Sequence, residues 1–143
     1  MADPRDPAAK VVNFLHRNLF LATKGRIGGK VMGMPAVLLT TTGRKSGEKR
    51  QSMLTSPLIE GDTVILIASW GGGPKHPQWY LNLQANPQVE VTRAGHTTKM
   101  TARTASPEER AELWPRVTST YKGYAGYQEK TDREIPVVIL TPA

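Results

Sequence analysis

Apolar residues recur along this chain at two different spacings, and these spacings separate helices from strands. From Pro7 to Ala22 they return every three or four positions, the period of one helix face, until Gly25 ends the pattern. Asp6 and Pro7 fit the N-cap and first residue of that helix. Shorter apolar runs of strand length follow at about 35–42, 50–59 and 62–69. The pattern predicts one amphipathic helix followed by three strands.

Turn residues divide the rest of the chain. Glu60-Gly61-Asp62 forms a short hairpin connection between the second and third strands, and Ala94-Gly95-His96 forms a similar turn further on. Between them, Pro77 suits the first turn of a short helix. Ser106-Pro107-Glu108-Glu109 has the residues of a capping box, so a third helix begins there, and Pro115 disturbs it without necessarily ending it. The remaining predicted strands are 88–94, 97–105 and 135–140.

Six short strands in hairpin pairs, with helices inserted rather than alternating with them, predict an α+β domain. Its antiparallel sheet is expected to curl into a small barrel. The 143 residues are enough for one domain with its own core. We divide the chain into an N-terminal helix and basic loop, 1–30, and a barrel domain, 31–143. The glycine-rich stretch 24–33 is expected to be loop.

Composition and charge exclude several kinds of chemistry. The chain has no cysteine, which excludes disulfides, thiolate nucleophiles and iron–sulfur clusters, and its three histidines are too scattered for a metal motif. A net charge of +7 points to an anionic partner: nucleic acid, an acidic lipid surface, or a small molecule with phosphates or carboxylates. Nucleic acid is disfavoured because aromatic residues are only 6% of the chain and the cations cluster at turns.

The densest group of cations lies directly after the first apolar strand. Arg44, Lys45, Lys49 and Arg50 surround the turn signal Ser46-Gly47, so they are expected to fan out around a hairpin tip. Arginine offers a fork of donors and lysine a mobile point charge, a combination that suits a phosphate or carboxylate ligand. The alternative is a solvated hairpin tip without a ligand.

A second candidate is the glycine loop that follows the strand ending near Ala68. The amides of Gly71, Gly72 and Gly73, together with the N-terminus of the next helix, have the geometry to hold an anion. Neither of the common glycine-rich nucleotide-binding fingerprints is present. A plain connection between strand and helix is the alternative.

A third candidate is a group of tyrosines near the C-terminus. Trp114, Val117, Tyr121 and Tyr124 step by three or four residues, so they share one helical face and fit a core stripe. Gly123 and Gly126 weaken the helix, which favours instead tyrosines on a less regular segment beside a pocket. There, phenol groups can donate hydrogen bonds to a substrate oxygen.

Four stretches taken together resemble the deazaflavin-dependent nitroreductase family of actinobacteria, whose members bind coenzyme F-420. They are 37–50 (VLLTTTGRKSGEKR), 64–91, 101–117 and 121–140, and they cover almost everything after about residue 31. The resemblance implies a split β-barrel like that of FMN-binding proteins, in agreement with the barrel expected from the hairpins. It also gives the basic hairpin a ligand, since the coenzyme carries a phosphodiester and a tail of glutamates.

The resemblance also implies which residues form the site. Ser69, Tyr121, Tyr124 and Tyr127 match positions that contact the substrate. The implied cofactor-binding residues are Arg44, Lys45, Ser46, Arg50, Ser69, Trp70, Gly71, Gly72, Gly73, Pro77, Trp79 and Asn82. Trp70 departs from the family pattern, because a bulky indole stands where a small or charged residue is common.

The implied activity is hydride transfer from reduced coenzyme F-420 to an electron-poor molecule: a quinone, an activated enone or lactone, or a nitroaromatic. FMN as the cofactor, with its phosphate on the same basic turn, is one alternative, and a deazaflavin carrier without catalysis is another. We expect a cytoplasmic protein, monomeric or homodimeric. Its first helix is expected either to cover the barrel or to contact a membrane surface peripherally.

Overall fold

In the computed structural model, residues 30–31 and 34–143 are described. The helix expected at 7–22, and with it the choice between a lid and a membrane contact, lies outside the described residues. Of the loop expected at 24–33, the pair Lys30–Val31 forms a short strand, β1, that pairs with Met34 and Pro35. The rest of that stretch also lies outside the described residues.

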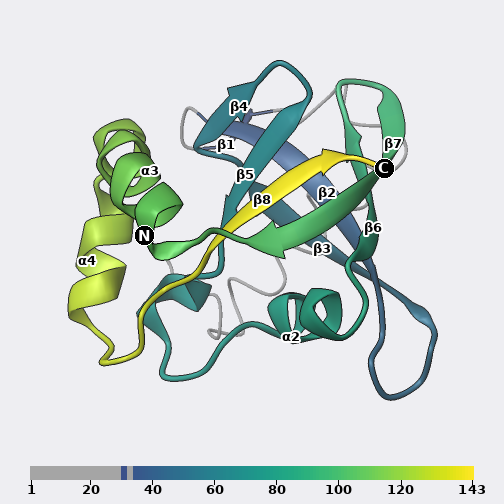
Figure 1. The fold of residues 1–143 in the computed structure, drawn as a ribbon, viewed down its shortest axis with the longest axis horizontal. Coiled ribbons are helices and arrows are strands. Elements are labelled where there is room, and N and C mark those ends of the chain that lie inside the picture. The colour runs from purple at the N-terminus through teal and green to yellow at the C-terminus, as the bar shows by residue number, and fades with distance from the viewer. Residues whose placement is uncertain (1–29, 32–33) are drawn as a thin grey trace.

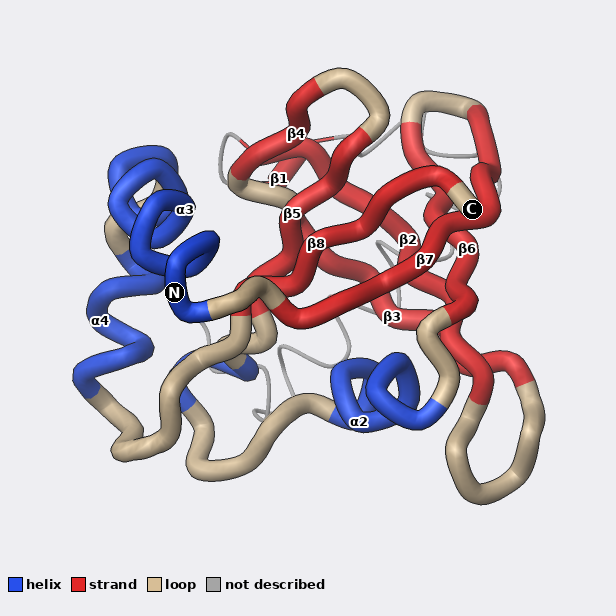
Figure 2. Tube along the Cα trace, viewed as in Figure 1, coloured by secondary structure: helices blue, strands red, loops and turns tan. Residues whose placement is uncertain are grey.

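The described strands form a single antiparallel sheet that curls without closing (Figures 1 and 2). Its order is β1-β2-β6-β7-β8-β5-β4, with β3 also paired to β2, and no pairing joins β4 back to β1 or β3. This open barrel confirms the predicted α+β split barrel. The other strands are β2 (Met34–Thr42), β3 (Lys49–Thr55), β4 (Leu58–Glu60), β5 (Thr63–Ile67), β6 (Gln88–Arg93), β7 (His96–Thr104) and β8 (Val137–Pro142).

The helices lie in two places. A 3-10 turn, η1 (Trp70–Gly72), and helix α2 (Gln78–Ala85) follow β5. Helices α3 (Pro107–Thr120) and α4 (Gly123–Glu129) pack together on another side of the sheet, while α2 lies below it (Figure 1). The capping box predicted at the start of α3 is confirmed: Ser106 accepts from the Glu109 amide, whose side chain accepts from the Ser106 amide. Pro115 stays inside α3.

The core is double because the central strands are buried on both faces. In β5, Val64 and Leu66 pack into a cluster with α2, whereas Ile65 and Ile67 pack into a cluster with α3 and α4. Successive side chains of a strand point to opposite faces, so this alternation follows from the strand geometry. It also explains why strands here appear in the sequence as continuous apolar runs.

The strand expected at 50–59 is broken in the structure. Its first part is β3, paired with β2, and its last part is β4, paired with β5. Ser56, at the break, is fully buried; its hydroxyl donates to the carbonyls of Leu58 and Ile65 at 3.0 and 2.6 Å, and its amide donates to Pro35 at 2.9 Å. Pro57 has no N–H to continue the ladder. The corner therefore carries the chain from one side of the barrel to the other.

The spacing of the tyrosines fits one continuous helix, but the structure divides them between two helices. Tyr121 is the C-cap of α3 with extended backbone, and α4 starts anew at Gly123. A β-carbon at Gly123 would collide with the Tyr121 ring, so the ring lies directly over this glycine. The glycine thus permits the sharp turn that separates the two helices.

Candidate functional site

The basic turn is the tip of the β2–β3 hairpin. Its backbone is closed by hydrogen bonds from the Gly43 amide to the Glu48 carbonyl at 2.7 Å and from the Gly47 amide to the Gly43 carbonyl at 2.8 Å. Gly47 adopts a φ of 74°, the left-handed region that glycine enters without strain. The tip is therefore a defined turn, and it holds Arg44, Lys45 and Arg50 on the surface.

Arg44 is anchored on helix α2. Its backbone amide and its guanidinium both donate to Asn82 Oδ1, at 3.2 and 2.9 Å, and its other nitrogen donates to Gln78 Oε1 at 2.8 Å. Asn82 is only 4% exposed, and its amide nitrogen donates to Thr41 Oγ1 at 3.4 Å. The Asn82 oxygen therefore accepts hydrogen bonds from Arg44, and these bonds hold the hairpin against helix α2.

The other two cations implied to bind the coenzyme, Lys45 and Arg50, have weaker attachments. Arg50 lies 3.7 Å from a Glu48 carboxylate oxygen and 3.5 Å from the Ser46 hydroxyl, and all three side chains are exposed. Lys45 makes no ion pair or hydrogen bond within residues 34–143. Exposed ion pairs contribute little to stability, so the charges of Lys45 and Arg50 are both available to bind an anion from solution.

The glycine loop is a 3-10 turn that packs against α4. The amides of Gly72 and Gly73 donate to the carbonyls of Ser69 and Trp70 at 2.9 and 3.0 Å. In this structure both amides are used by the turn itself, so the expected role of these glycines in holding an anion remains a prediction. Trp70 has a φ of 45°, a strained value for a residue with a side chain.

Contact between this loop and α4 requires a glycine. Gly72 has a φ of 80°, and a β-carbon on it would lie 2.9 Å from the Tyr127 carbonyl oxygen. Gly73 faces the Trp70 indole at similarly close range. The loop and the tyrosine helix are consequently in direct backbone contact.

Arg133, which the sequence analysis did not identify, ties this loop together. It lies between α4 and β8, and its guanidinium donates to the carbonyls of Ala68, Ser69 and Gly73 at 3.1, 2.8 and 3.1 Å. It also lies 3.0 Å from His76 Nδ1. Its partners are about 60 residues away in the chain, so no local pattern in the sequence reveals it.

His76 contacts Arg133 on one side and the Tyr80 ring on the other, with ring centroids 5.0 Å apart in an edge-on arrangement. Burial lowers the pKa of His76 below its usual value, and the charge of Arg133 lowers that pKa further. The imidazole is therefore neutral at physiological pH, with Nδ1 accepting from Arg133.

The three tyrosines form one cluster. Tyr121 and Tyr124 pack edge to face with centroids 5.1 Å apart, and the hydroxyls of Tyr121 and Tyr127 lie 3.4 Å apart. Tyr124 is 5% exposed, and its hydroxyl lies 3.9 Å from Met34 Sδ. Burial raises the pKa of Tyr124, against a hydrogen bond with Thr55 that lowers it, so this phenol stays protonated.

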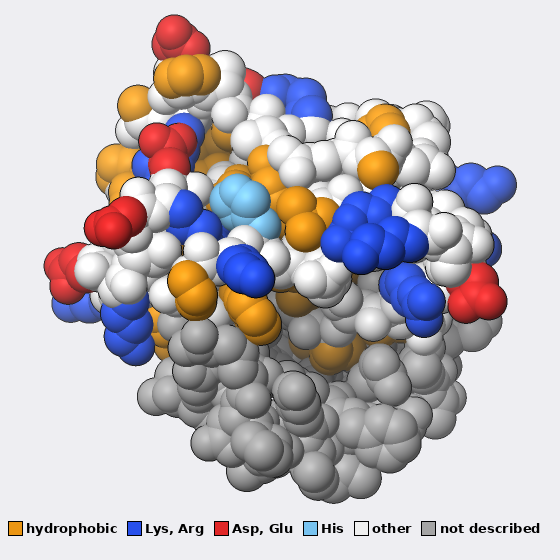
Figure 3. Space-filling model, turned by 90° about the horizontal axis from the view of Figure 1, so that it is seen from below, with side chains coloured by type: hydrophobic (Ala, Val, Ile, Leu, Met, Phe, Trp, Pro, Cys, Tyr) orange, Lys and Arg blue, Asp and Glu red, His pale blue; other side chains and the backbone are white. Residues whose placement is uncertain are grey.

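The structure thus brings most of the predicted residues to one end of the barrel. The glycine loop contacts the tyrosine helix through Gly72, while Arg133 and His76 connect the loop to α2. Figure 3 views the molecule from this end, where Lys and Arg side chains lie beside hydrophobic ones. Two further predicted residues lie at the start of α2: Pro77 is its buried N-cap, and Trp79, 7% exposed, packs in the core.

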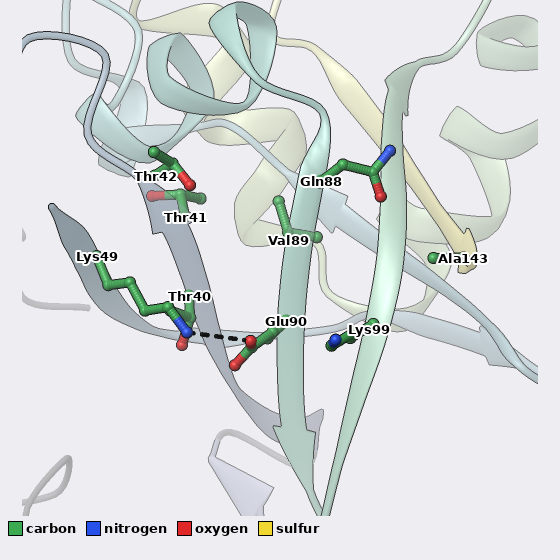
Figure 4. A pocket seen from close by; sticks show the side chains of 9 residues that line it. All are labelled: Thr40, Thr41, Thr42, Lys49, Gln88, Val89, Glu90, Lys99 and Ala143. Carbon is green, nitrogen blue, oxygen red and sulfur yellow. Dashed lines mark hydrogen bonds and ion pairs between the residues drawn. The ribbon is translucent and has the colours of Figure 1, made fainter. Parts of the chain in front are cut away.

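A hollow of about 270 Å³ lies elsewhere, across β2, β6 and β7 (Figure 4). Lys49 and Glu90 form an ion pair of 3.2 Å there, and Lys99 stands beside them. Lys49 is one of the four cations expected at the hairpin tip, but none of the residues implied to contact the coenzyme or the substrate lines the hollow. We therefore place the candidate site at the tyrosine end of the barrel rather than in this hollow.

Within residues 30–31 and 34–143, no helix is long and apolar enough to cross a membrane. No group of three or more His, Asp or Glu side chains there is arranged to hold a metal ion.

The open antiparallel barrel defines the class of protein, the split β-barrel proteins. Within this class, residues 14–142 match the model of the family described as F-420H(2)-dependent quinone reductase. This match spans most of the 143 residues, so the chain belongs to that family.

Individual relatives agree with the family match. An F-420H(2)-dependent quinone reductase of Mycobacterium tuberculosis is 40% identical over 131 residues, which are 89% of this chain and 87% of the relative. A solved F-420-H2 dependent reductase is 47% identical with a TM-score of 0.67, covering 74% of this chain and 93% of its own. A solved domain-swapped dimer is 41% identical with a TM-score of 0.69, covering 94% and 99%.

Proposed function

We propose that this protein is an oxidoreductase that transfers a hydride from reduced coenzyme F-420 to a quinone. Membership of the F-420H(2)-dependent quinone reductase family, together with relatives named for the same activity, is the observation that carries this proposal. Activated enones, lactones and nitroaromatics are further candidate substrates, since they too accept a hydride at an electron-poor centre.

The residues of the hairpin tip and of the start of α2 fit the acidic part of the coenzyme. Lys45 and Arg50 are exposed cations with few competing partners, which suits a ligand that carries a phosphodiester and glutamates. Arg44 is held against the first turn of α2, and the N-cap Pro77 makes no side-chain hydrogen bond to that turn. A helix N-terminus carries partial positive charge, which adds to that of the arginine.

The segment from Ser69 to Gly73 is proposed to lie along the deazaflavin ring. The amides of Gly72 and Gly73 are used within the turn, and the space beside these glycines is filled by Tyr127 and Trp70, so the two residues are proposed to shape the turn rather than to offer free amides. In this arrangement Asn82 acts on the coenzyme through Arg44, and Trp79 supports α2 from the core. When bound, the reduced coenzyme supplies the hydride.

The protein's contribution to the reaction is orientation and hydrogen bonding. Tyr121 and Tyr127, with hydroxyls 3.4 Å apart, and Ser69 are proposed to donate to the quinone oxygen that gains negative charge. Tyr124, buried between the other two rings, stays protonated and orients them. A protonated phenol can also deliver the proton that completes reduction of the quinone to a hydroquinone.

Titration and turnover together test the function. Reduced coenzyme F-420 and reduced FMN are added separately to the protein, binding is followed by absorbance, and oxidation is then measured with a benzoquinone, an enone and a nitroaromatic. We expect saturable binding of the deazaflavin and turnover with the benzoquinone. Binding of FMN alone would favour the FMN alternative, and deazaflavin binding without turnover of any substrate would favour the carrier.

The oligomeric state belongs to the same proposal. The relative solved as a domain-swapped dimer supports a homodimer for this chain, with a monomer as the alternative. Light scattering after size-exclusion chromatography separates the two, since a dimer would have twice the 15.7 kDa mass of one chain.

A further inference from the structure

The segment from Ala68 to His76 needs a constraint that its own sequence does not provide. Three consecutive glycines give it high conformational freedom, and within it the backbone bonds are those of the short turn η1. Trp70 is nevertheless held at a φ of 45°. Such a backbone persists only where surrounding contacts fix it.

Arg133 supplies those contacts. Its guanidinium is bonded to carbonyls at the start and the end of the turn, Ser69 and Gly73, and to the preceding Ala68. Arginine is suited to this position because it offers five donors in a rigid plane, has no acceptor and keeps its charge at every physiological pH. A shorter or unforked side chain cannot reach three carbonyls at once.

Arg133 is itself held by the tyrosine helix. Gln128 of α4 donates to the Arg133 carbonyl at 2.8 Å, and the same side chain accepts from the Ile135 amide at 2.8 Å and from Arg110 at 3.2 Å. The chain around Arg133 is therefore fixed to α4 by Gln128, which also contacts Arg110 of α3. A change at Arg133 acts on the turn and on its contact with the tyrosine helix together.

The fourth contact of Arg133 depends on the charge of His76. Nδ1 accepts from the guanidinium only while the imidazole is neutral, and protonation would place two cations 3.0 Å apart. The groups that contact His76 are Arg133 and the Tyr80 ring, and no carboxylate pairs with it within the described part of the chain. Acid pH therefore opens this contact.

We propose that Arg133 is a positioning residue for cofactor binding: it fixes the segment 68–76 in the conformation that receives the deazaflavin ring, and neutral His76 completes the clamp. This inference rests on the proposed function. It assigns the constraint on the glycine loop to a residue about 60 positions further along the chain.

The test compares Arg133→Gln, Arg133→Lys and the control Arg93→Gln, which removes an arginine at the end of β6, outside the proposed site. Amide hydrogen exchange of residues 69–73 and the Kd for reduced coenzyme F-420 are measured for each. Arg133→Gln should speed hydrogen exchange of these amides and raise Kd about tenfold. A tenfold rise corresponds to a fall of the binding-competent fraction to about a tenth. Arg133→Lys, which keeps the charge without the fork, should be intermediate.

The outcomes separate two failures. If the wild-type protein does not bind the coenzyme, the proposed function fails. If the wild type binds and Arg133→Gln, still folded by circular dichroism, binds within twofold of it, the positioning role is refuted. A lower Tm with unchanged Kd would likewise leave Arg133 with a purely structural role.

The His76 part has its own readout. Kd is measured from pH 8 to pH 5 for the wild type and for His76→Gln, which retains an acceptor but cannot be protonated. The ratio of wild-type Kd to variant Kd should rise several-fold as the pH falls through the His76 pKa; ionisation of the coenzyme affects both proteins and cancels in this ratio. A ratio that is constant over the range overturns the role of His76.

Discussion

Asn82 offers a direct test of how the basic rim is organised, because its oxygen is shared by two donors of Arg44. Substitution Asn82→Ala removes both hydrogen bonds, together with the longer one to Thr41, and leaves Arg44 only its bond to Gln78. We expect the protein to fold, with the hairpin less firmly fixed on α2.

The magnitude follows from the hydrogen bonds between Asn82 and Arg44 that this substitution removes. A hydrogen bond to a charged group contributes about 1.5–3 kcal/mol. Arg44 is exposed and keeps one partner, so we expect the lower end, a decrease of about 1–2 kcal/mol in unfolding free energy. If the same energy orients Arg44 toward the coenzyme, Kd for reduced coenzyme F-420 rises roughly tenfold, since 1.4 kcal/mol is one decade.

A second substitution at the same position distinguishes an action through Arg44 from direct contact with the coenzyme. Asn82→Asp keeps the acceptor and adds an ion pair with Arg44, so Kd by calorimetry should stay within about threefold of the wild type. Gln84→Ala, on the same helix and away from Arg44, is the control. If Asn82→Asp binds more weakly than Asn82→Ala, the carboxylate is repelling the coenzyme and our account of Asn82 is wrong.

Three other predictions concern the elements around the site. Gly72→Ala should destabilise the protein by about 1–3 kcal/mol in urea unfolding, because of its positive φ and its contact with Tyr127, whereas Gly126→Ala should be neutral or stabilising, because it is helical with open space around it. Equal effects of the two would contradict this. Ser106→Ala should cost about 1 kcal/mol by removing the capping box, and an unchanged Tm would count against it. Since the folded-state pKa of Tyr124 is raised, its contribution is complete below the unfolded pKa, about 10, and is lost as pH rises through the folded value. Tyr124→Phe should therefore reduce the alkaline fall in stability, and an identical pH profile would argue against a buried phenol.

Much of the fold follows from local sequence signals. The hairpin at Gly61, the turn at Gly95 and the capping box at Ser106 lie where turn and cap chemistry predicts them. The break after β3 does not, because it depends on a hydrogen bond between Ser56 and Pro35, distant in sequence. A run of residues typical of one strand can therefore be shared between two edges of a barrel.

The positive charge of the site was predictable from the sequence, whereas the residues that hold the glycine loop in place were not. The cations of the hairpin are evident from residues 44–50, and their exposure in the structure agrees with a rim open to an anion. In the sequence Arg133 lies between two acidic residues, Asp132 and Glu134, a pattern typical of a solvent-exposed charged segment. Only the folded chain brings it to the carbonyls of the glycine loop.

The central claim is that cations of the hairpin tip hold the acidic part of the coenzyme. The most direct measurement is the Kd of the double variant Lys45→Gln, Arg50→Gln for reduced coenzyme F-420 and for the same deazaflavin without its phosphate and glutamates. We predict that the wild type binds the complete coenzyme far more tightly than the truncated one, and that the double variant loses most of this difference. A double variant that retains the full wild-type preference would contradict the account.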